Sequence, residues 1–385
     1  MSSPRPEPGA DILVVDDTPA NLRLLSQTLT EAGYQVRAAT SGTRGLESAL
    51  AVPPNLVMLD IRMPGMDGFE VCRKLKDCEL TRDVPVIFIS AVDELEEKVH
   101  AFRAGGVDYI TKPFQSEEVL ARVETHLSLR RLQLSLEATN RRLARELALA
   151  GKVQASFLPR TLPKRAGWTF GAYLRPARET SGDFYDVLSL PNGRVGLLIA
   201  DVVDKGVPAA LLMAMSWSLI CSHIDQNPDN PGQAFSFVNS SLHSHLGGEQ
   251  FVTAFLGILD TETGQIACTN AGQMPPFLLV SQTEDPVEIP TAGLPLGVEP
   301  GGKWPPTQHQ LDVGEAILLY TDGLTDARDS KGRAYGRARL RKNASTCLGQ
   351  SADEIVETIL RNVDAFVGDE PQVDDMALVV ASRVA

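Results

Sequence analysis

Aspartates that stand at the ends of short apolar runs occur in two widely separated parts of the chain. They constrain its fold more than any other feature. The N-terminal set is Asp16, Asp17 and Asp60, and the C-terminal set is Asp183, Asp201, Asp322 and Asp374. Carboxylates brought together from strand ends suit Mg²⁺ or Mn²⁺, because hard cations take oxygen ligands. Two such sets predict two domains with two phosphoryl chemistries, one of which could control the other.

Continuous apolar runs alternate with helical patterns in residues 10–127. The runs at 12–15, 56–59 and 86–89 are typical of strands buried on both faces of a parallel sheet. Residues 20–32 and 68–76 carry apolar side chains at helical spacing. This alternation predicts a doubly wound α/β sheet, in which ligands bind beyond the carboxyl ends of the strands.

Chemically active residues fall at those predicted strand ends. Ser90 ends the third run and Lys112 follows the short run at 108–110. Together with the three aspartates they supply ligands for a cation, a carboxylate free to attack phosphorus, a hydroxyl and an ammonium group. An aspartate can accept a phosphoryl group once a cation and a lysine offset the developing charge. Strand-end aspartates are often only caps or turn formers, but that reading leaves the serine and lysine unexplained.

These stretches resemble the receiver domain of two-component response regulators. The matching residues are 14–17, 59–68, 89–91 and 111–114. The resemblance implies a five-stranded receiver in which a histidine kinase is the phosphodonor for Asp60. It implies that Ser90 and Lys112 contact the phosphoryl group and that Tyr109 is the switch residue. It also implies a Mg²⁺ site whose ligands are Asp16, Asp17, Asp60 and the Arg62 carbonyl. The acidic run from Asp93 to Glu97 is expected to be a solvated helix start.

Residues 128–160 have the composition of a helical linker. Leucines at 129, 132, 136 and 143 follow an a/d-like spacing, with arginine and glutamate between them. This pattern predicts one long helix, which either pairs with a second copy as a coiled coil or lies on its own domains. We expect the coiled coil, and therefore a homodimer, with the helical pattern ending at Pro159.

Short β-type runs and two helix-like stretches, 208–224 and 352–367, predict an α+β fold for residues 161–385. The four C-terminal aspartates stand at the strand ends of this region. Four carboxylates converging from separate strands can hold two divalent ions and generate a bridging hydroxide at neutral pH. No Ser-His-Asp order, reactive cysteine motif or Walker loop competes with this reading. A metal-assisted hydrolase is therefore expected.

The segment from Glu146 to the C-terminus resembles the PPM family of metal-dependent serine/threonine phosphatases, in its SpoIIE-type, RsbU-like branch. The matching residues are 153–159, 181–186, 201–211, 270–272, 293–297 and 320–327. The resemblance implies a β-sandwich flanked by helices, with two Mn²⁺ or Mg²⁺ ions. It implies the ligands Asp183, Asp201, the Val202 carbonyl, Asp322 and Asp374. It further implies a phosphoserine or phosphothreonine protein as substrate, and we expect an anti-sigma-factor antagonist of the STAS fold.

Four residues depart from the pattern of that family. Asp204 replaces glycine, Gln273 histidine, Met274 asparagine and Ala377 threonine. Gln273 cannot transfer a proton as histidine does, although its amide can still donate a hydrogen bond. None of the four is an implied metal ligand, so we expect phosphatase activity to be retained. We expect the residues at these four positions to determine how high that activity is.

The favoured hypothesis is a response regulator in which phosphorylation of Asp60 controls the phosphatase through the linker. The alternative is a non-catalytic, RssB-like adaptor that binds a sigma factor or anti-sigma partner. A DNA-binding output is disfavoured, because the net charge of −13 opposes nucleic-acid binding and no basic recognition helix follows residue 128.

The location of the protein is expected to be cytoplasmic. The first eight residues do not resemble a signal peptide, and we expect no apolar stretch of membrane-spanning length. Five cysteines without a C-x-x-C pair are typical of reduced thiols.

Overall fold

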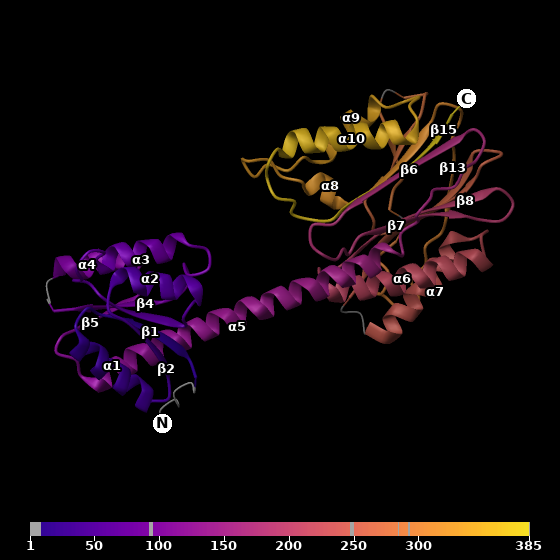
Figure 1. Ribbon diagram of the computed structural model, residues 1–385. Helices are drawn as coiled ribbons and strands as arrows, with labels where there is room; N and C mark the ends of the chain where they lie inside the picture. The colour runs from indigo at the N-terminus through magenta and orange to yellow at the C-terminus, as the bar shows by residue number, and fades with distance from the viewer. Residues whose placement is uncertain (1–8, 92–94, 247–249, 284, 292, 385) are drawn as a thin grey trace. The chain divides into compact units, whose positions relative to one another are not determined.

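The computed structural model describes residues 9–91, 95–246, 250–283, 285–291 and 293–384 (Figure 1). The chain divides into two compact units at Arg142 and Leu143. This boundary falls inside the helix α5, Ser116–Ala155, which continues for 40 residues. The helix therefore begins before the predicted linker of residues 128–160 and ends before Pro159.

The first unit contains a parallel five-stranded sheet with the strand order β2-β1-β3-β4-β5. The strands are β1 (Asp11–Val15), β2 (Gln35–Ala39), β3 (Leu56–Asp60), β4 (Val86–Ser90) and β5 (Asp108–Thr111). The helices are α1 (Pro19–Glu31), α2 (Gly42–Ala51), α3 (Gly68–Asp77), α4 (Leu95–Arg103) and the beginning of α5. The order reverses between β1 and β3, so that the carboxyl ends of these strands flank a crevice.

Alternating side chains of each strand enter two different cores, which explains the continuous apolar runs. Ile12 and Val14 pack with α1 and the first part of α5. Leu13 and Val15 pack on the opposite face with residues of α2, α3 and α4. Both faces of the sheet are thus covered by helices (Figure 1), which confirms the predicted doubly wound fold.

The second unit contains two antiparallel five-stranded sheets. One has the order β13-β10-β9-β8-β7, and the other β12-β11-β14-β15-β6. The strands of the first sheet are β7 (Phe184–Ser189), β8 (Arg194–Val202), β9 (Val252–Asp260), β10 (Gln265–Ala271) and β13 (Thr307–Gln310). Those of the second are β6 (Trp168–Arg175), β11 (Phe277–Leu279), β12 (Val287–Glu288), β14 (Ala316–Tyr320) and β15 (Met376–Arg383).

The two sheets face each other across a shared core and carry helices on their outer faces, which confirms the predicted sandwich. The helices are α6 (Val207–Gln226), α7 (Pro231–Leu246), α8 (Asp322–Asp326), α9 (Arg337–Ser345) and α10 (Ala352–Val367). Leu197 of β8 and Val379 of β15 meet in the core between the sheets. Their sequence neighbours point to the outer faces: Leu198 packs under α6 and α7, and Leu378 packs under α9 and α10.

The expectation that no apolar stretch reaches the length of a membrane span is wrong for α6. This helix has 20 residues and is apolar enough, by length and composition alone, to cross a membrane. Its buried residues are Ala209, Leu212, Met213, Ser216, Ile220 and Ile224. They belong to the core that α6 shares with the first sheet and α7, so packing within the domain accounts for the apolar sequence.

Candidate phosphoryl-acceptor site and candidate metal centre

The structure brings the three N-terminal aspartates together at the carboxyl ends of β1 and β3. Carboxylate oxygens of Asp16, Asp17 and Asp60 lie within 4.8 Å of one another. Asp16 and Asp60 are buried, whereas Asp17 is partly exposed. Three carboxylates at this spacing fit a Mg²⁺ site that is open to solvent on one side.

Lys112 places its ammonium group against two of these carboxylates. Its Nζ lies 2.8 Å from Asp60 Oδ2 and 3.0 Å from Asp16 Oδ2. Burial lowers the pKa of Lys112, but the bonds to Asp60 and Asp16 outweigh burial and hold that pKa above its ordinary value. Burial also raises the pKa of Asp60 despite the bond from Lys112. The lysine is therefore positioned to offset negative charge beside the predicted phosphoacceptor.

Ser90, at the end of β4, is bonded to α4 rather than to Asp60. Its hydroxyl donates to Glu97 Oε2 at 2.6 Å, and Arg62 Nη2 donates to Glu97 Oε1 at 2.9 Å. The prediction that the acidic helix start is solvated is therefore wrong for Glu97, because its side chain is only 18% exposed. Asp93 and Glu94 of that run lie outside the described residues.

Tyr109, the predicted switch residue, lies in β5 with its ring against cationic and aromatic neighbours. Lys98 Nζ lies 4.5 Å from the ring centroid, and Phe102 packs edge-on at 6.1 Å. A narrow space that is too small to hold a water molecule is lined by Ser90, Tyr109, Glu97 and Ala101. The predicted switch residue is thus a neighbour of the contact between Ser90 and Glu97.

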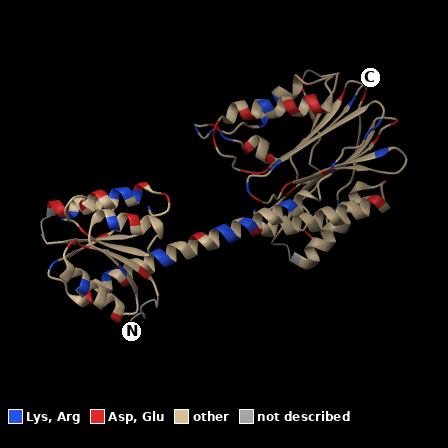
Figure 2. Ribbon diagram, in the orientation of Figure 1, with Lys and Arg blue, Asp and Glu red and all other residues tan. Residues whose placement is uncertain are grey.

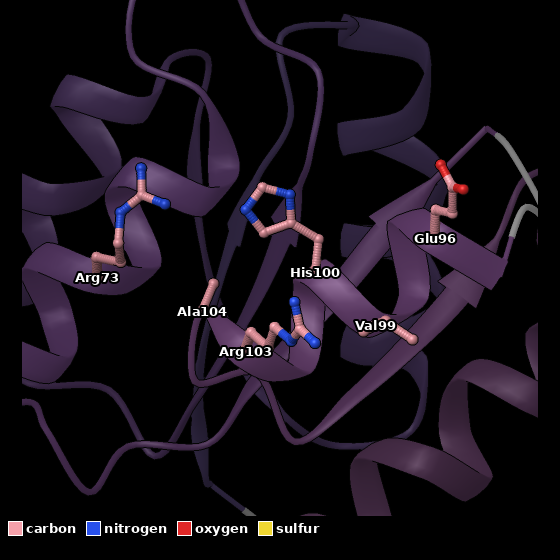
Figure 3. Close-up of a pocket in the computed structure, with 6 residues that line it drawn as sticks. All are labelled: Arg73, Glu96, Val99, His100, Arg103 and Ala104. Carbon is pink, nitrogen blue, oxygen red and sulfur yellow. The ribbon is translucent and has the colours of Figure 1, made fainter.

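A separate pocket of about 470 Å³ lies between α3 and α4 (Figure 3). Its lining residues are Arg73, Glu96, Val99, His100, Arg103 and Ala104. The ring of His100 stacks on Phe69 with centroids 4.2 Å apart, which orients the imidazole at the middle of the pocket. None of the predicted site residues lines it, so it is distinct from the phosphoryl-acceptor site.

The four C-terminal aspartates lie at one end of the sandwich. In β8, residues 195, 197 and 199 face the core between the sheets, and Asp201 continues that alternation. Asp183 precedes β7, Asp322 begins α8 directly after β14, and Asp374 precedes β15. All four predicted acidic ligands are therefore at strand ends, as the sequence predicts.

The charges of these aspartates interact strongly. Burial and the charge of Asp201 raise the pKa of Asp183 well above its ordinary value. Burial and the charge of Asp322 raise the pKa of Asp201 to about 7. Burial and the charge of Asp374 raise the pKa of Asp322. Carboxylates that repel one another in a buried place need a cation to remain ionised together.

One oxygen of Asp183 supports a cation at this centre. Asp183 Oδ2 is buried and has no hydrogen-bond partner among the residues that the structure describes. An unpaired buried carboxylate oxygen is costly unless something else satisfies it. A divalent cation would do so, and the oxygen-rich donor set is the one that Mg²⁺ and Mn²⁺ prefer. The predicted ligand at residue 202 lies close to the loop that carries Asp183. A Cβ atom added to Gly182 would be only 3.0 Å from the Val202 carbonyl oxygen.

Asp375 and Gln154 support the loop before Asp183. Asp375 accepts hydrogen bonds from Ser181 Oγ and from the Gly182 amide, both at 2.8 Å. Gln154 lies in the last turn of α5. Its side-chain amide donates a hydrogen bond to the Ser181 carbonyl oxygen and accepts one from the Ser181 backbone amide. Helical periodicity alone assigns Gln154 to a buried face and cannot show what it contacts.

Lys205 is a second residue that the sequence did not reveal as part of the centre. Its Nζ lies 2.7 Å from Asp374 Oδ1 and donates to the Val373 carbonyl. Asp374 is therefore paired with a lysine in this structure, and a cation that binds Asp374 has to compete with that ammonium group.

The four departures from the family pattern lie around this centre. Asp204 has a φ of +78°, in the left-handed region where glycine is favoured. Gln273 is buried, and its Oε1 accepts from Thr253 Oγ1 at 2.9 Å. Ala377 is buried between the sheets, and Met274 packs against the core beside α9 and α10. Gln273 Nε2, in contrast to its Oε1, is buried without a hydrogen-bond partner among the described residues.

Two family models match the chain. The response regulator receiver domain matches residues 12–124. Stage II sporulation protein E (SpoIIE) matches residues 191–384, which is half of the chain. Each match falls in one of the two structural units.

Individual proteins resemble the chain as well. Protein IcfG of Synechocystis sp. is 30% identical over 264 residues, covering 62% of this chain and 41% of that protein. Phosphoserine phosphatase RsbU of Bacillus subtilis is 27% identical over 263 residues, covering 68% and 74%. The SiaA-PP2C domain of Pseudomonas aeruginosa shares the fold, with a TM-score of 0.57 and 21% identity over 64% of this chain and 99% of that one. The chain spans under half the length of the first curated relatives it matches.

Proposed function

Because the chain belongs to the Stage II sporulation protein E (SpoIIE) family and carries a response regulator receiver domain, we propose that it is a response regulator with a metal-dependent phosphoprotein phosphatase as its output. A histidine kinase would supply the phosphoryl group to Asp60. The phosphorylated receiver would then change the activity of the second unit through α5.

The acceptor site has the groups that phosphoryl transfer to an aspartate requires. Asp60 supplies the attacking oxygen, and Lys112 is already within 2.8 Å of it. Asp16, Asp17 and the Arg62 carbonyl would hold Mg²⁺, which supplies further positive charge when bound. Lys112 would stay with the phosphoryl oxygens, because the developing negative charge attracts its ammonium group more strongly than Asp16 does.

The second site would remove a phosphoryl group from another protein. Asp183, Asp201, Asp322, Asp374 and the Val202 carbonyl would hold two Mn²⁺ or Mg²⁺ ions, which supply a hydroxide nucleophile when bound. RsbU is by name a phosphoserine phosphatase, which supports phosphoserine or phosphothreonine as the substrate. We propose a STAS-type anti-sigma-factor antagonist as the protein that carries it.

The single observation that carries this proposal is the buried, unpartnered oxygen of Asp183. The charge of Asp201 acts on Asp183, and the charges of Asp322 and Asp374 act in turn on Asp201. An adaptor that only binds a partner has no need of such a repulsive cluster, because the cluster costs stability unless a cation offsets it. The presence of all four acids therefore favours an enzyme over the adaptor. Calorimetric titration with Mn²⁺ separates the two, since an adaptor would bind cation only at the receiver.

The proposal is tested by phosphate release from a phosphorylated STAS-type protein in the presence of Mn²⁺. Wild type should release phosphate, whereas Asp183→Asn and Asp322→Asn should be at least about a hundredfold slower. Asp312→Asn serves as the charge-matched control and should match wild type, because Asp312 is exposed and precedes β14, whereas Asp322 follows the other end of that strand. Equal rates for all four proteins would show that the metal centre is assigned to the wrong residues.

We also propose that α5 mediates a homodimer. Leu129, Leu132, Leu136 and Leu143 are each at least 50% exposed in the single chain. Arginines and glutamates lie between them along the middle of the helix (Figure 2). A row of exposed leucines at a/d spacing with charged flanks is the pattern of a two-stranded coiled coil.

A further inference from the structure

Glu97 connects helix α4 to two residues at the rim of the phosphoryl-acceptor site. One carboxylate oxygen accepts the Ser90 hydroxyl at 2.6 Å, and the other accepts Arg62 Nη2 at 2.9 Å. Burial raises the pKa of Glu97, but the bonds from Ser90 and Arg62 outweigh burial and hold that pKa below its ordinary value. Glu97 is thus an ionised acceptor, and Ser90 is the donor in their bond.

The Ser90 hydroxyl has one proton to donate. In this structure that proton is directed to Glu97. In the phosphorylated receiver, Ser90 is expected to donate it to an oxygen of the phosphoryl group on Asp60. The two bonds exclude each other, so formation of the second requires that the first be broken.

We propose that Glu97 is a positioning residue that opposes phosphorylation of Asp60 by withholding the Ser90 hydroxyl from the phosphoryl group. This inference rests on the proposed function of the receiver. Of the two groups that Glu97 holds, Ser90 carries the effect. The Arg62 side chain is 70% exposed, and an exposed ion pair contributes little.

Release of Ser90 would also loosen α4. The Ser90 bond and the Arg62 pair join the first turn of this helix to the end of β4 and to the segment after β3. When the Ser90 hydroxyl donates its hydrogen bond to the phosphoryl group, its bond to Glu97 is lost. Of these two contacts, only the exposed ion pair between Arg62 and Glu97 then remains. Phosphorylation at Asp60 is thereby coupled to a change in the attachment of α4.

The test measures loading of Asp60 in the full-length protein with Mg²⁺. In the covalent reaction, an Asp60 oxygen forms a bond to the phosphorus of acetyl phosphate, the bond from phosphorus to the acetyl oxygen breaks, and acetate leaves. Its rate is followed by phosphate-affinity electrophoresis. Beryllofluoride, which mimics the bound phosphoryl group, is titrated calorimetrically in parallel. These two readouts do not depend on phosphatase activity.

The informative variant is Glu97→Ala, with Glu96→Ala as its matched control. Both residues are acidic and lie in the first turn of α4, so both substitutions remove the same charge from the same helix terminus. Glu97→Ala should bind beryllofluoride about tenfold more tightly and react faster with acetyl phosphate, because the competing charge-assisted bond is gone. Glu96→Ala should stay within about twofold of wild type.

A double-mutant cycle separates the hydroxyl bond from a general charge effect. In the Ser90→Ala background, Glu97→Ala should give no further gain, because there is no hydroxyl to release. Unchanged or weaker loading of Glu97→Ala would overturn the inference, and so would an equal gain in the Ser90→Ala background. If wild type does not load at all while Asp60→Asn behaves identically, the proposed receiver function fails together with the inference. If wild type loads normally and Glu97→Ala shows no gain, only the inference fails.

Discussion

The side-chain amide of Gln154 forms a two-sided hydrogen bond with the backbone of Ser181. Gln154 Nε2 donates to the Ser181 carbonyl oxygen, and the Ser181 amide donates to Gln154 Oε1 at 2.9 Å. Ser181 stands two residues before Asp183, and its hydroxyl also donates to Asp375. The last turn of α5 is therefore bonded directly to the loop that carries a predicted metal ligand.

Loss of this contact should weaken the metal centre. In Gln154→Ala, the buried carbonyl and amide of Ser181 lose their partners, at a cost of about 2 kcal/mol. We expect a lower melting temperature and a drop of about tenfold in kcat/KM for phosphate release, together with weaker Mn²⁺ binding. The control is Lys152→Ala, an exposed position in the same turn. Wild-type Mn²⁺ affinity in Gln154→Ala would show that α5 does not support the centre.

Cation binding at the second site should depend on pH. The pKa of Asp201 is raised from 3.8 to about 7, so the folded protein without metal binds this proton more tightly than the unfolded chain does. The resulting contribution to stability is present at low pH and is lost as the pH rises through about 7. Because a cation needs the ionised carboxylate, Mn²⁺ has to displace the proton below that pH.

This competition has two measurable consequences. The gain in melting temperature from Mn²⁺ should be larger at about pH 8 than at about pH 6. Calorimetric titrations in buffers with different ionisation enthalpies should show proton release at the lower pH and little at the higher. A Mn²⁺ affinity that is identical at both values would mean that Asp201 is not a ligand.

The leucine row of α5 should control the oligomeric state. Leu132→Asp and Leu136→Asp would each place a charge at the predicted contact of two helices, and burial of an unpaired charge is costly. We expect wild type to be a dimer by size-exclusion chromatography with light scattering, and the variants to be monomers. Leu80, which is 69% exposed outside this row, provides the matched control in Leu80→Asp. A monomeric wild type would show that α5 does not form a coiled coil.

Most of the fold could be predicted because its signals are local. The runs at β1, β3 and β4 are apolar on both faces, which only a sheet covered on both sides explains. Strand ends in turn determine where Asp60 and Asp201 lie. The apolar sequence of α6 was ambiguous, because a helix buried in a domain and a membrane span have the same composition.

The contacts that tie the sites together could not be predicted in the same way. Gln154 and Ser181 are separated by 27 residues, and Lys205 and Asp374 by more than 160. Nothing in the composition near either member indicates its partner. Glu97 was expected to be solvated because it stands in an acidic helix start, yet the proximity of Ser90 gives it a hydrogen-bonding role. Pairings of this kind depend on tertiary structure rather than on local pattern.

Control of the phosphatase by the receiver is tested most directly by the phosphatase activity of the full-length protein with and without beryllofluoride. Phosphate release from the phosphorylated STAS-type protein is measured in Mn²⁺ and Mg²⁺ for wild type and for Asp60→Asn. We predict that beryllofluoride changes the wild-type rate, in either direction, by about tenfold or more, whereas Asp60→Asn does not respond. A wild-type rate that beryllofluoride leaves unchanged, although calorimetry shows it bound at the receiver, would contradict control of the phosphatase by Asp60.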